Sequence, residues 1–374
     1  MKIILLVIDG FGVGESPDAS EFNDVGSNTY KNIVAQTHLA LPTLEKLGLD
    51  LIDGLNLNKP HEIMGAYARL QEKSVNKDSL TGHWEMMGIV TTKKYQSFPN
   101  EIDANVVKKV QEAIGETLFN RAGSGTDLIK QLGHEHILTK KPILYSSQDS
   151  VLQIACHDSV YKLDSLYEMC QKVKAVCDKN FEIQRIIARP FSTNEKGEFY
   201  RTNDRKDFSI LPPSDSALNY LQKNGILTIG VGKIGDIFSN LGLSESYGAH
   251  TNLAVFEKTF ELIKSVEKNA FIFVNLVDTD MLYGHRNDVI GYANCLKAID
   301  GNVKNMISKL DDDDILMISG DHGNDPTTKS TDHSREWVPL LIYGKTIKPH
   351  NLGSIYGFDY IGNFIKSKLL NDKN

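Results

Sequence analysis

Three groups of aspartate and histidine residues in this sequence carry side chains that commonly bind transition metals. The first group is a single aspartate near the start of the chain, and the other two lie within its last hundred residues. Carboxylate and imidazole together favour zinc, manganese or iron, whereas calcium prefers sites made only of oxygen atoms. The candidate ligands are Asp9, Asp280, His285, Asp321, His322 and His333. Three carboxylates and three imidazoles are enough for two ions that share a site.

Each of these residues has an ordinary structural explanation when it is taken singly. An aspartate after a strand is usually a turn residue or a helix cap, and a single histidine is more often hydrogen-bonded than metal-bound. The three groups nevertheless follow apolar runs that are typical of strands, namely Ile3–Ile8, Phe271–Val277 and Ile315–Ile318. In open α/β sheets, ligands bind beyond the carboxyl ends of the strands. We therefore predict a two-metal centre at that edge, of the kind that clamps both oxygens in phosphoryl transfer.

The elements that must position these groups alternate between strand and helix. Short runs that are apolar at every position indicate parallel strands covered on both faces. The clearest amphipathic helix covers Val289 to Leu310, where apolar residues recur every three or four positions. The predicted strands of the core are Ile3–Ile8, Ile226–Val231, Phe271–Val277, Ile315–Ile318 and Val338–Tyr343. This alternation predicts an α/β fold with a mostly parallel sheet flanked by helices.

The segment 92–212 differs from the rest of the chain because it is richer in lysine and more irregular. It contains strand-like runs at Ile143–Tyr145 and Arg185–Ala188, and helical patterns at Ala104–Ile114 and Ser165–Val176. We interpret this segment as an α+β domain inserted into the α/β core. The predicted domains are therefore a core of residues 1–91 and 213–374 and an insertion of residues 92–212.

Composition argues against several classes of protein. The 374 residues carry a net charge of −7, which argues against nucleic acid as a partner. The apolar start of the chain is short and ends at Asp9, so it predicts a buried strand rather than a signal peptide. No apolar stretch approaches the ~20 residues that span a membrane.

The four cysteines form no CxxC pair, which predicts free thiols in a reducing cytoplasm. We expect a monomer by default.

A distinctive polar stretch, Ser79–Glu85, contains a candidate nucleophile in Thr81. A threonine followed by glycine can begin a helix, and Thr81 would then act as the N-cap. A hydroxyl at a helix N-terminus near a divalent cation is also well placed for attack, because the cation lowers its pKa and the amide dipoles favour phosphate. The residue types alone favour the capping role.

Longer stretches of the sequence are specific enough to indicate a family. The chain resembles the phosphopentomutase family, within the alkaline phosphatase superfamily. The similar stretches are Asp9–Asp18, Lys77–Gly88, Tyr145–His157, Ile187–Phe191, Arg201–Phe208, Gly232–Phe238, Asn275–Arg286, Asp321–Pro326 and Thr331–Pro339. The metal motifs alone indicate only the superfamily, whereas the stretches TGHWE, DSVLQIA, IARPF and DMLYGHR together indicate this mutase.

The resemblance implies a fold and a set of roles around two metal ions. The fold would be an alkaline-phosphatase-like core with an inserted cap domain that binds the substrate. One metal would be held beside Thr81 by Asp9, Asp321 and His322, and the other would be held by the remaining three ligands. The family usually uses manganese, and Thr81 would be its phosphorylated threonine. The metal site that the residue types predict would thus serve phosphate transfer.

The resemblance also implies a set of substrate-binding residues. Arg189 and Arg205 would bind the substrate phosphate, since an arginine fork can donate two parallel hydrogen bonds. Ser147 and Asp149 would contact the sugar, and Lys233 is a further candidate for phosphate contact. The chain departs from the family pattern at two places. It has Gly10 where a serine is common, and its loop Ser192–Glu198 lacks the expected arrangement near the arginines.

The implied reaction interconverts ribose 1-phosphate, or 2-deoxyribose 1-phosphate, and the 5-phosphate. It would pass through a phosphothreonine and a sugar 1,5-bisphosphate, which would also act as an activator. Two other hypotheses remain at this point. One is a related phosphomutase or phosphatase of the same superfamily, such as a phosphoglycerate mutase, which uses a serine nucleophile and a longer insertion. The other is a metal-binding protein without catalytic activity.

Overall fold

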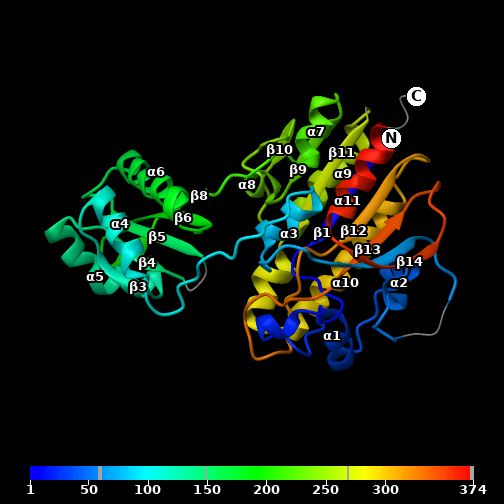
Figure 1. The fold of residues 1–374 in the computed structure, drawn as a ribbon, viewed down its shortest axis with the longest axis horizontal. Coiled ribbons are helices and arrows are strands. Elements are labelled where there is room, and N and C mark those ends of the chain that lie inside the picture. Colours follow the sequence, from blue (N-terminus) through cyan, green and yellow to red (C-terminus); the bar gives the residue numbers. More distant parts are fainter. Residues whose placement is uncertain (58–60, 148–149, 268, 371–374) are drawn as a thin grey trace. The chain divides into compact units, whose positions relative to one another are not determined.

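The computed structural model describes residues 1–57, 61–147, 150–267 and 269–370. The chain forms two compact units (Figure 1). We call Met1–Thr92 with Pro212–Asn374 the core unit, and Lys93–Leu211 the insert unit. The insertion that we predict from sequence, residues 92–212, differs from the insert unit by one residue at each end.

The core unit is built on an eight-stranded mixed sheet with the order β10-β9-β11-β1-β12-β13-β2-β14. Most neighbouring strands are parallel, and β13 runs antiparallel to both of its neighbours. The strands are β1 (Lys2–Ile8), β2 (Ala66–Gln71), β9 (Leu227–Val231), β10 (Glu245–Tyr247), β11 (Ala270–Leu276), β12 (Ile315–Ser319), β13 (Val338–Tyr343) and β14 (His350–Tyr356). The predicted α/β fold with a mostly parallel sheet is therefore confirmed.

The central strands are apolar along their whole length because both faces of the sheet are covered. Every residue of β1, β11 and β12 is buried, as expected for parallel strands in the middle of an α/β sheet. In the register of this sheet, Ile8 pairs with Leu276 and Val7 pairs with Ser319. The three strands thus end at the same edge, where the polar residues that follow them must gather.

Helices cover the two faces of this sheet with different sets of side chains. The helices of the core unit are α1 (Thr29–Thr37), α2 (Pro42–Lys46), α3 (Ser79–Met86), α7 (Ala217–Lys223), α8 (Ile234–Ile237), α9 (Asn252–Ser265), α10 (Val289–Ile307) and α11 (Asp359–Leu370). One face, with Ile4 and Leu6, packs in a single apolar cluster with residues of α1, α2, α9 and α10. On the other face, Phe273 contacts rings from α3 and from the end of α8. The amphipathic helix predicted at 289–310 is α10, which ends at Ile307.

The insert unit has its own sheet with the order β3-β4-β5-β6-β7, and β8 pairs with β6. Its elements are α4 (Ala104–Ile114), β3 (Leu118–Ala122), α5 (Gly125–Thr139), β4 (Ile143–Ser146), β5 (Val151–His157), α6 (Leu163–Asn180), β6 (Arg185–Thr193), β7 (Phe199–Arg201) and β8 (Lys206–Ser209). Helices α4 and α6 share one apolar cluster with the sheet, and α5 shares another. The two strand-like runs predicted in this segment lie in β4 and β6, and the two helical patterns lie in α4 and α6.

Two sequence-based expectations about the whole chain can be compared with the structure. All four cysteines are free thiols, and three of them, Cys156, Cys170 and Cys177, are buried. Among the helices that the structure describes, none has the length and apolar character needed to cross a membrane.

Candidate metal centre and active site

The first part of the site forms where β1 and β12 end. Asp9 directly follows β1 and is fully buried, and its backbone N–H continues the sheet by donating to Leu276 O at 3.1 Å. The backbone N–H of Gly10 then donates to Asp321 Oδ1 at 3.0 Å. Gly10 has φ +77, a conformation that an L side chain adopts only with strain. Glycine at this position therefore lets the chain turn tightly between two candidate ligands.

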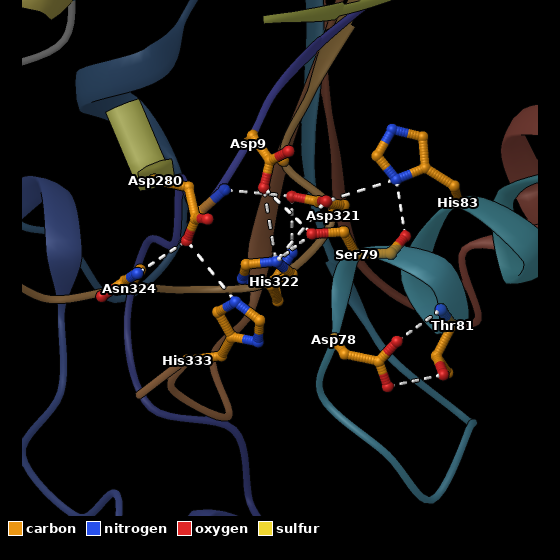
Figure 2. Close-up of polar contacts among 12 residues, drawn as sticks. Asp9, Asp78, Ser79, Thr81, His83, Asp280, Asp321, His322, Asn324 and His333 are labelled. Atoms are coloured by element: carbon orange, nitrogen blue, oxygen red, sulfur yellow. Dashed lines mark hydrogen bonds and ion pairs between the residues drawn. The ribbon is translucent and has the colours of Figure 1, made fainter. Parts of the chain in front are cut away.

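Asp9, Asp321 and His322 form the first candidate metal cluster (Figure 2). Their ligand atoms all lie within 4.8 Å of one another. His322 Nε2 is 3.5 Å from Asp9 Oδ1 and 3.5 Å from Asp321 Oδ2. Asp321 Oδ2 is buried and accepts no hydrogen bond from the part of the chain that the structure describes. A buried carboxylate oxygen without a donor is costly, and a cation would satisfy it.

Asp280, His322 and His333 form the second candidate cluster, again with ligand atoms within 4.8 Å. Asp280 lies in a short π-helix, Thr279–Tyr283, which a 3-10 turn continues to His285. This irregular turn brings His285 Nε2 to 3.1 Å from Asp280 Oδ2, while His333 Nε2 is 3.6 Å from Asp280 Oδ1. The structure thus brings all six predicted ligands together from four separate segments, and His322 belongs to both clusters.

Two of the three imidazoles in the site are held so that Nε2 faces the carboxylates. His322 Nδ1 is 3.0 Å from Gly323 O, and His285 Nδ1 is 2.7 Å from Thr331 O. A carbonyl bound to Nδ1 fixes the ring and leaves Nε2 as the free ligand atom, as is usual for metal-binding histidines.

The electrostatics of the site are dominated by charges that share a buried space. Burial acts to raise the pKa of Asp280, but His333 and His285 lower it to about 2. Burial acts to lower the pKa of His285, but the hydrogen bond with Asp280 raises it to about 9. Burial and the neighbouring His322 lower the pKa of His333 to about 4. The carboxylates therefore draw positive charge into the site.

These residues fit two transition-metal ions. Three carboxylates and three imidazoles converge, one buried carboxylate oxygen has no donor among the described residues, and both clusters combine oxygen with nitrogen ligands. This donor set suits manganese, iron or zinc better than calcium.

The helix α3 begins beside the first cluster and is capped by Asp78. The Asp78 carboxylate accepts hydrogen bonds from Thr81 N at 3.2 Å and from Thr81 Oγ1 at 2.9 Å. The cap is therefore Asp78 and not the predicted Thr81. Figure 2 shows that the hydroxyl of Thr81 points to this cap and away from Asp9, Asp321 and His322.

The hydroxyl that reaches the metal ligands is that of Ser79, which sequence reasoning missed. Ser79 Oγ donates to Asp9 Oδ1 at 3.2 Å and lies 3.1 Å from His322 Nε2 (Figure 2). Ser79 and Thr81 are two residues apart on a helix, so their side chains point about 200° away from each other. Only one of the two hydroxyls can face the cluster, and in this structure it is Ser79.

Two further residues fasten α3 to the ligands. His83, one turn after Ser79, has Nδ1 at 2.7 Å from Ser79 O and at 3.2 Å from Asp321 Oδ2. Asn275 at the end of β11 donates to Asp9 Oδ2 at 3.1 Å, and its Nδ2 is 3.2 Å from His83 Nε2. A Cβ on Gly82 would overlap the carbonyl oxygen of Asp321. The Gly-His pair of this stretch therefore allows the helix to approach the metal ligands.

Comparisons with known proteins identify the family of this chain. A family model described as the metalloenzyme superfamily matches residues 1–372. A phosphopentomutase from Acetivibrio thermocellus is 45% identical over 357 residues, which cover 94% of this chain and 92% of that protein. The chain belongs to the phosphopentomutase family of isomerases.

Two other comparisons extend this result. A phosphopentomutase from Clostridium kluyveri is 42% identical over 377 residues, covering 100% of this chain and 96% of that protein. A solved protein structure from Pyrococcus horikoshii covers 100% of this chain and 97% of its own, with 14% identity and a TM-score of 0.51. That likeness concerns the fold.

The substrate-binding residues implied by the phosphopentomutase family are distributed over both units. In the core unit, Lys233 precedes α8, and its Nζ is 3.9 Å from Asp9 Oδ2. The Lys233 side chain is 38% exposed, so it can meet both the ligands and a solvent-borne phosphate. In the insert unit, Ser147 is exposed and lines a pocket of ≈ 530 Å³ together with Arg121 and Ser124. Asp149 lies outside the described residues.

The two predicted arginines of the insert unit lie in a shared basic region. Arg189 Nε donates to Gln153 Oε1 at 2.8 Å. Arg205 makes a two-pronged contact with Asp207, at 2.7 and 2.6 Å. Burial lowers the pKa of Arg189, and the positive charges of Arg205 and Arg201 lower it further. This grouping of like charges is typical of an anion-binding surface.

Arg201 is a third basic residue of this region that sequence reasoning missed. Its Nη2 donates to Tyr145 Oη at 3.2 Å, and that hydroxyl donates to Gln153 Oε1 at 3.1 Å. Gln153 Oε1 also accepts from Arg189, so a hydrogen-bonded chain links the two guanidinium groups. The sequence signal was present, since Arg201 begins one of the stretches that resemble the family.

Proposed function

We propose that this chain interconverts ribose 1-phosphate, or 2-deoxyribose 1-phosphate, and the corresponding 5-phosphate. Membership in the phosphopentomutase family supports this reaction. The observation that carries the proposal is the position of Ser79 Oγ, which lies at the start of a helix and contacts both Asp9 and His322. A hydroxyl placed among candidate metal ligands is suited to accept and release a phosphoryl group.

Ser79 is the phosphate carrier in this proposal, and the predicted Thr81 stays as the alternative carrier. The hydroxyl of Thr81 donates to the Asp78 cap, whereas that of Ser79 contacts the ligands. The backbone carbonyl of Ser79 is held by His83, which also contacts Asp321. This contact keeps the Ser79 side chain directed at the first cluster.

Two divalent ions, with manganese as the proposed metal, would be held by the six ligands. Asp9, Asp321 and His322 would hold the ion next to Ser79, and the other three ligands would hold the second. When bound, the ions neutralise charge on the transferring phosphoryl group and lower the pKa of a nearby hydroxyl. The chain itself positions the hydroxyl and the substrate.

The proposed reaction is a pair of phosphoryl transfers. The Oγ–P bond of phosphorylated Ser79 breaks as the free sugar hydroxyl forms its own O–P bond, which gives a 1,5-bisphosphate. The proton of that sugar hydroxyl ends on Ser79 Oγ. The bisphosphate then presents its other phosphate, which returns to Ser79 as the proton returns to the sugar oxygen. A trace of 1,5-bisphosphate therefore activates enzyme that has lost its phosphate.

Basic side chains of the insert unit hold the phosphate that is not being transferred. Arg189, Arg201 and Arg205 bind it through charge-assisted hydrogen bonds, which are strong when the guanidinium is bidentate. Lys233 neutralises charge next to Asp9. Ser147 and Asp149 contact the sugar. The chain is proposed to work as a cytoplasmic monomer.

Mutase activity is the first measurement. The chain is supplied with Mn²⁺, ribose 5-phosphate and a trace of ribose 1,5-bisphosphate, and ribose 1-phosphate is trapped as inosine with hypoxanthine and a purine nucleoside phosphorylase. Inosine formation that depends on Mn²⁺ supports the proposal. Steady release of inorganic phosphate, or turnover of 3-phosphoglycerate without inosine, would instead assign the chain to another reaction of the superfamily.

A pair of variants distinguishes the two hydroxyls. Ser79→Ala removes the proposed carrier, and we expect mutase activity to fall by about a thousandfold or more. Thr81→Val removes only the contact with Asp78 and should cost about tenfold or less, in line with the loss of a capping interaction. Both residues fall in one tryptic peptide after Lys77, so fragmentation on either side of Leu80 is needed to locate the phosphate. Phosphate on Thr81 would restore the original prediction.

A further inference from the structure

Glu336 is a buried carboxylate that belongs to neither metal cluster. Its Oε1 accepts hydrogen bonds from Thr29 Oγ1 at 2.8 Å and from Ser334 Oγ at 2.7 Å. Its Oε2 accepts from Thr29 N at 2.9 Å and from Gly14 N at 3.2 Å. Within the described part of the chain, no lysine, arginine or histidine forms a salt bridge with it. Four neutral donors therefore surround a single carboxylate.

Such a group is expensive to bury without a cation. Burial raises the pKa of Glu336 to about 7 despite its hydrogen bonds, because charge is disfavoured in a medium of low polarity. The surrounding chain is nevertheless shaped to accommodate it. A Cβ on Gly12 would overlap Glu336 Oε2, and a Cβ on Gly323 would overlap Glu336 Oε1. Gly12, which follows Asp9, and Gly323, which follows His322, thus leave room for this carboxylate.

The donors to Glu336 come from segments that deliver metal ligands. Gly14 lies in the loop that follows Asp9, and Ser334 directly follows His333. Gly323 directly follows His322, and its backbone exchanges two hydrogen bonds with Ser334, at 3.1 and 2.7 Å. One buried side chain therefore connects the loops of three ligands.

A relay through Thr29 connects Glu336 with a fourth ligand. Thr29 Oγ1 donates to Glu336 and accepts from Asn324 N at 3.2 Å. The side chain of Asn324 donates from Nδ2 to Asp280 Oδ1 at 2.6 Å. The chain Glu336–Thr29–Asn324–Asp280 is buried along its whole length. The orientation of the Asp280 carboxylate therefore depends on a side chain that never contacts it.

We propose that Glu336 is a positioning residue that fixes Asp280 and His333 as ligands of the second metal ion and His322 as a ligand of the first. It acts through Ser334, Gly323 and the relay through Thr29, and it contacts neither substrate nor metal. This role rests on the proposed two-metal centre. It accounts for the retention of a buried charge that has no cationic partner among the described residues.

The test measures metal binding rather than turnover. Apoprotein is titrated with Mn²⁺, and free Mn²⁺ is counted by electron paramagnetic resonance. In Glu336→Gln, one acceptor oxygen becomes an NH₂ donor, so the four donors can no longer all be satisfied. We expect the weaker of the two Mn²⁺ affinities to fall about 10- to 100-fold, the usual cost of disturbing a partner of a metal ligand.

The matched control makes the same chemical change at another buried carboxylate. Asp300 on α10 is 5% exposed and accepts backbone hydrogen bonds from Thr43 and Leu44 at the start of α2. Asp300→Asn should lower the stability of the apoprotein and leave both Mn²⁺ affinities within about threefold of wild type. A similar loss of affinity in both variants would mean that Glu336 acts only through general stability.

A second pair of variants tests the relay without touching the carboxylate. Thr29→Val keeps the shape of the side chain and removes the hydroxyl, so the weaker Mn²⁺ affinity should fall about tenfold. Thr29→Ser keeps the hydroxyl and should recover most of that loss. If wild type binds two Mn²⁺ ions and neither E336Q nor T29V changes the Mn²⁺ affinity, the role of Glu336 is overturned and the metal centre stands. A wild-type chain that bound no Mn²⁺ would overturn the metal centre together with it.

Discussion

Both units of this chain hold a pair of neighbouring histidines that are buried or half-buried, but they surround them differently. In the insert unit, His136 Nε2 accepts from His157 N at 2.9 Å, and His136 Nδ1 is 2.7 Å from Lys141 O. The ring nitrogens of His157 are 2.7 Å from Ser159 Oγ and 2.8 Å from Thr193 Oγ1. These partners are neutral, and the nearby carboxylate of Asp158 is exposed.

In the core unit, His322 and His333 lie with ring centroids 3.9 Å apart and face carboxylates instead. His333 Nε2 is 3.6 Å from Asp280 Oδ1, and His322 Nε2 is 3.5 Å from Asp321 Oδ2. Burial alone therefore does not distinguish a structural histidine from a metal ligand. A structural histidine has hydrogen-bond partners in the protein for both ring nitrogens, whereas a metal-binding histidine faces carboxylates and other imidazoles that a cation can bridge.

The largest expected effect comes from breaking the core cluster. Asp321→Asn keeps the shape of a ligand and removes its charge, so mutase activity should fall by about a thousandfold or more. The apoprotein should stay within about 1 kcal/mol of wild type in unfolding free energy, because Asp321 Oδ2 accepts no hydrogen bond from the described residues. Coupled activity assays and urea unfolding of the apoprotein measure the two effects. A strongly destabilised apoprotein would mean that the cluster is structural, like the histidines of the insert unit.

The opposite pattern is expected for the insert unit. His136→Leu leaves the N–H of His157 and the carbonyl of Lys141 without partners, which should cost about 2–4 kcal/mol in the unfolding free energy of that unit. Hydrogen exchange of peptides from β5 and α5 reports this loss. Mn²⁺ binding by the core unit should be unchanged. A loss of Mn²⁺ affinity without a loss of stability would assign a metal role to these histidines.

Adding metal to the wild-type chain should affect the two units differently. Mn²⁺ at a hundred times its dissociation constant should stabilise the core unit by about 2.7 kcal/mol. Amide exchange should therefore slow in peptides from β11 and β12, which end at the ligands, and should not change in β5 of the insert unit. Addition of a chelator should reverse the change. Equal protection of both units would contradict a metal centre confined to the core unit.

The smallest expected effect is a pH dependence that is confined to the insert unit. Burial lowers the pKa of His136 below its ordinary value of 6.5. The unfolded chain therefore binds a proton that the folded unit excludes, so stability is full above pH 6.5 and falls as pH drops below it. Between pH 7.5 and 5.5 the insert unit should therefore lose stability. Hydrogen exchange at the two pH values measures this loss, and His136→Leu should abolish it.

The class of fold and the candidate metal ligands could be predicted from local patterns in the sequence. Runs such as Ile3–Ile8 are apolar at every position, and that pattern is local, so it predicts buried parallel strands without a structure. The six candidate ligands could be predicted because they follow such runs and the carboxyl ends of parallel strands share an edge. The longer motifs then indicated the family, which the relatives confirmed.

Only the tertiary structure decided which hydroxyl meets the ligands. Ser79 and Thr81 both carry a hydroxyl, so the sequence does not show which of them faces the candidate ligands. The orientation of α3 relative to Asp321 determines that it is Ser79 in this structure. Glu336 likewise acquires a role only through Thr29 and Asn324, which lie about three hundred residues apart in the chain. The physical reason is that a hydrogen bond requires an orientation within a fraction of an ångström. That orientation is set by the packing of distant segments, whereas periodicity along the chain records only which face is buried.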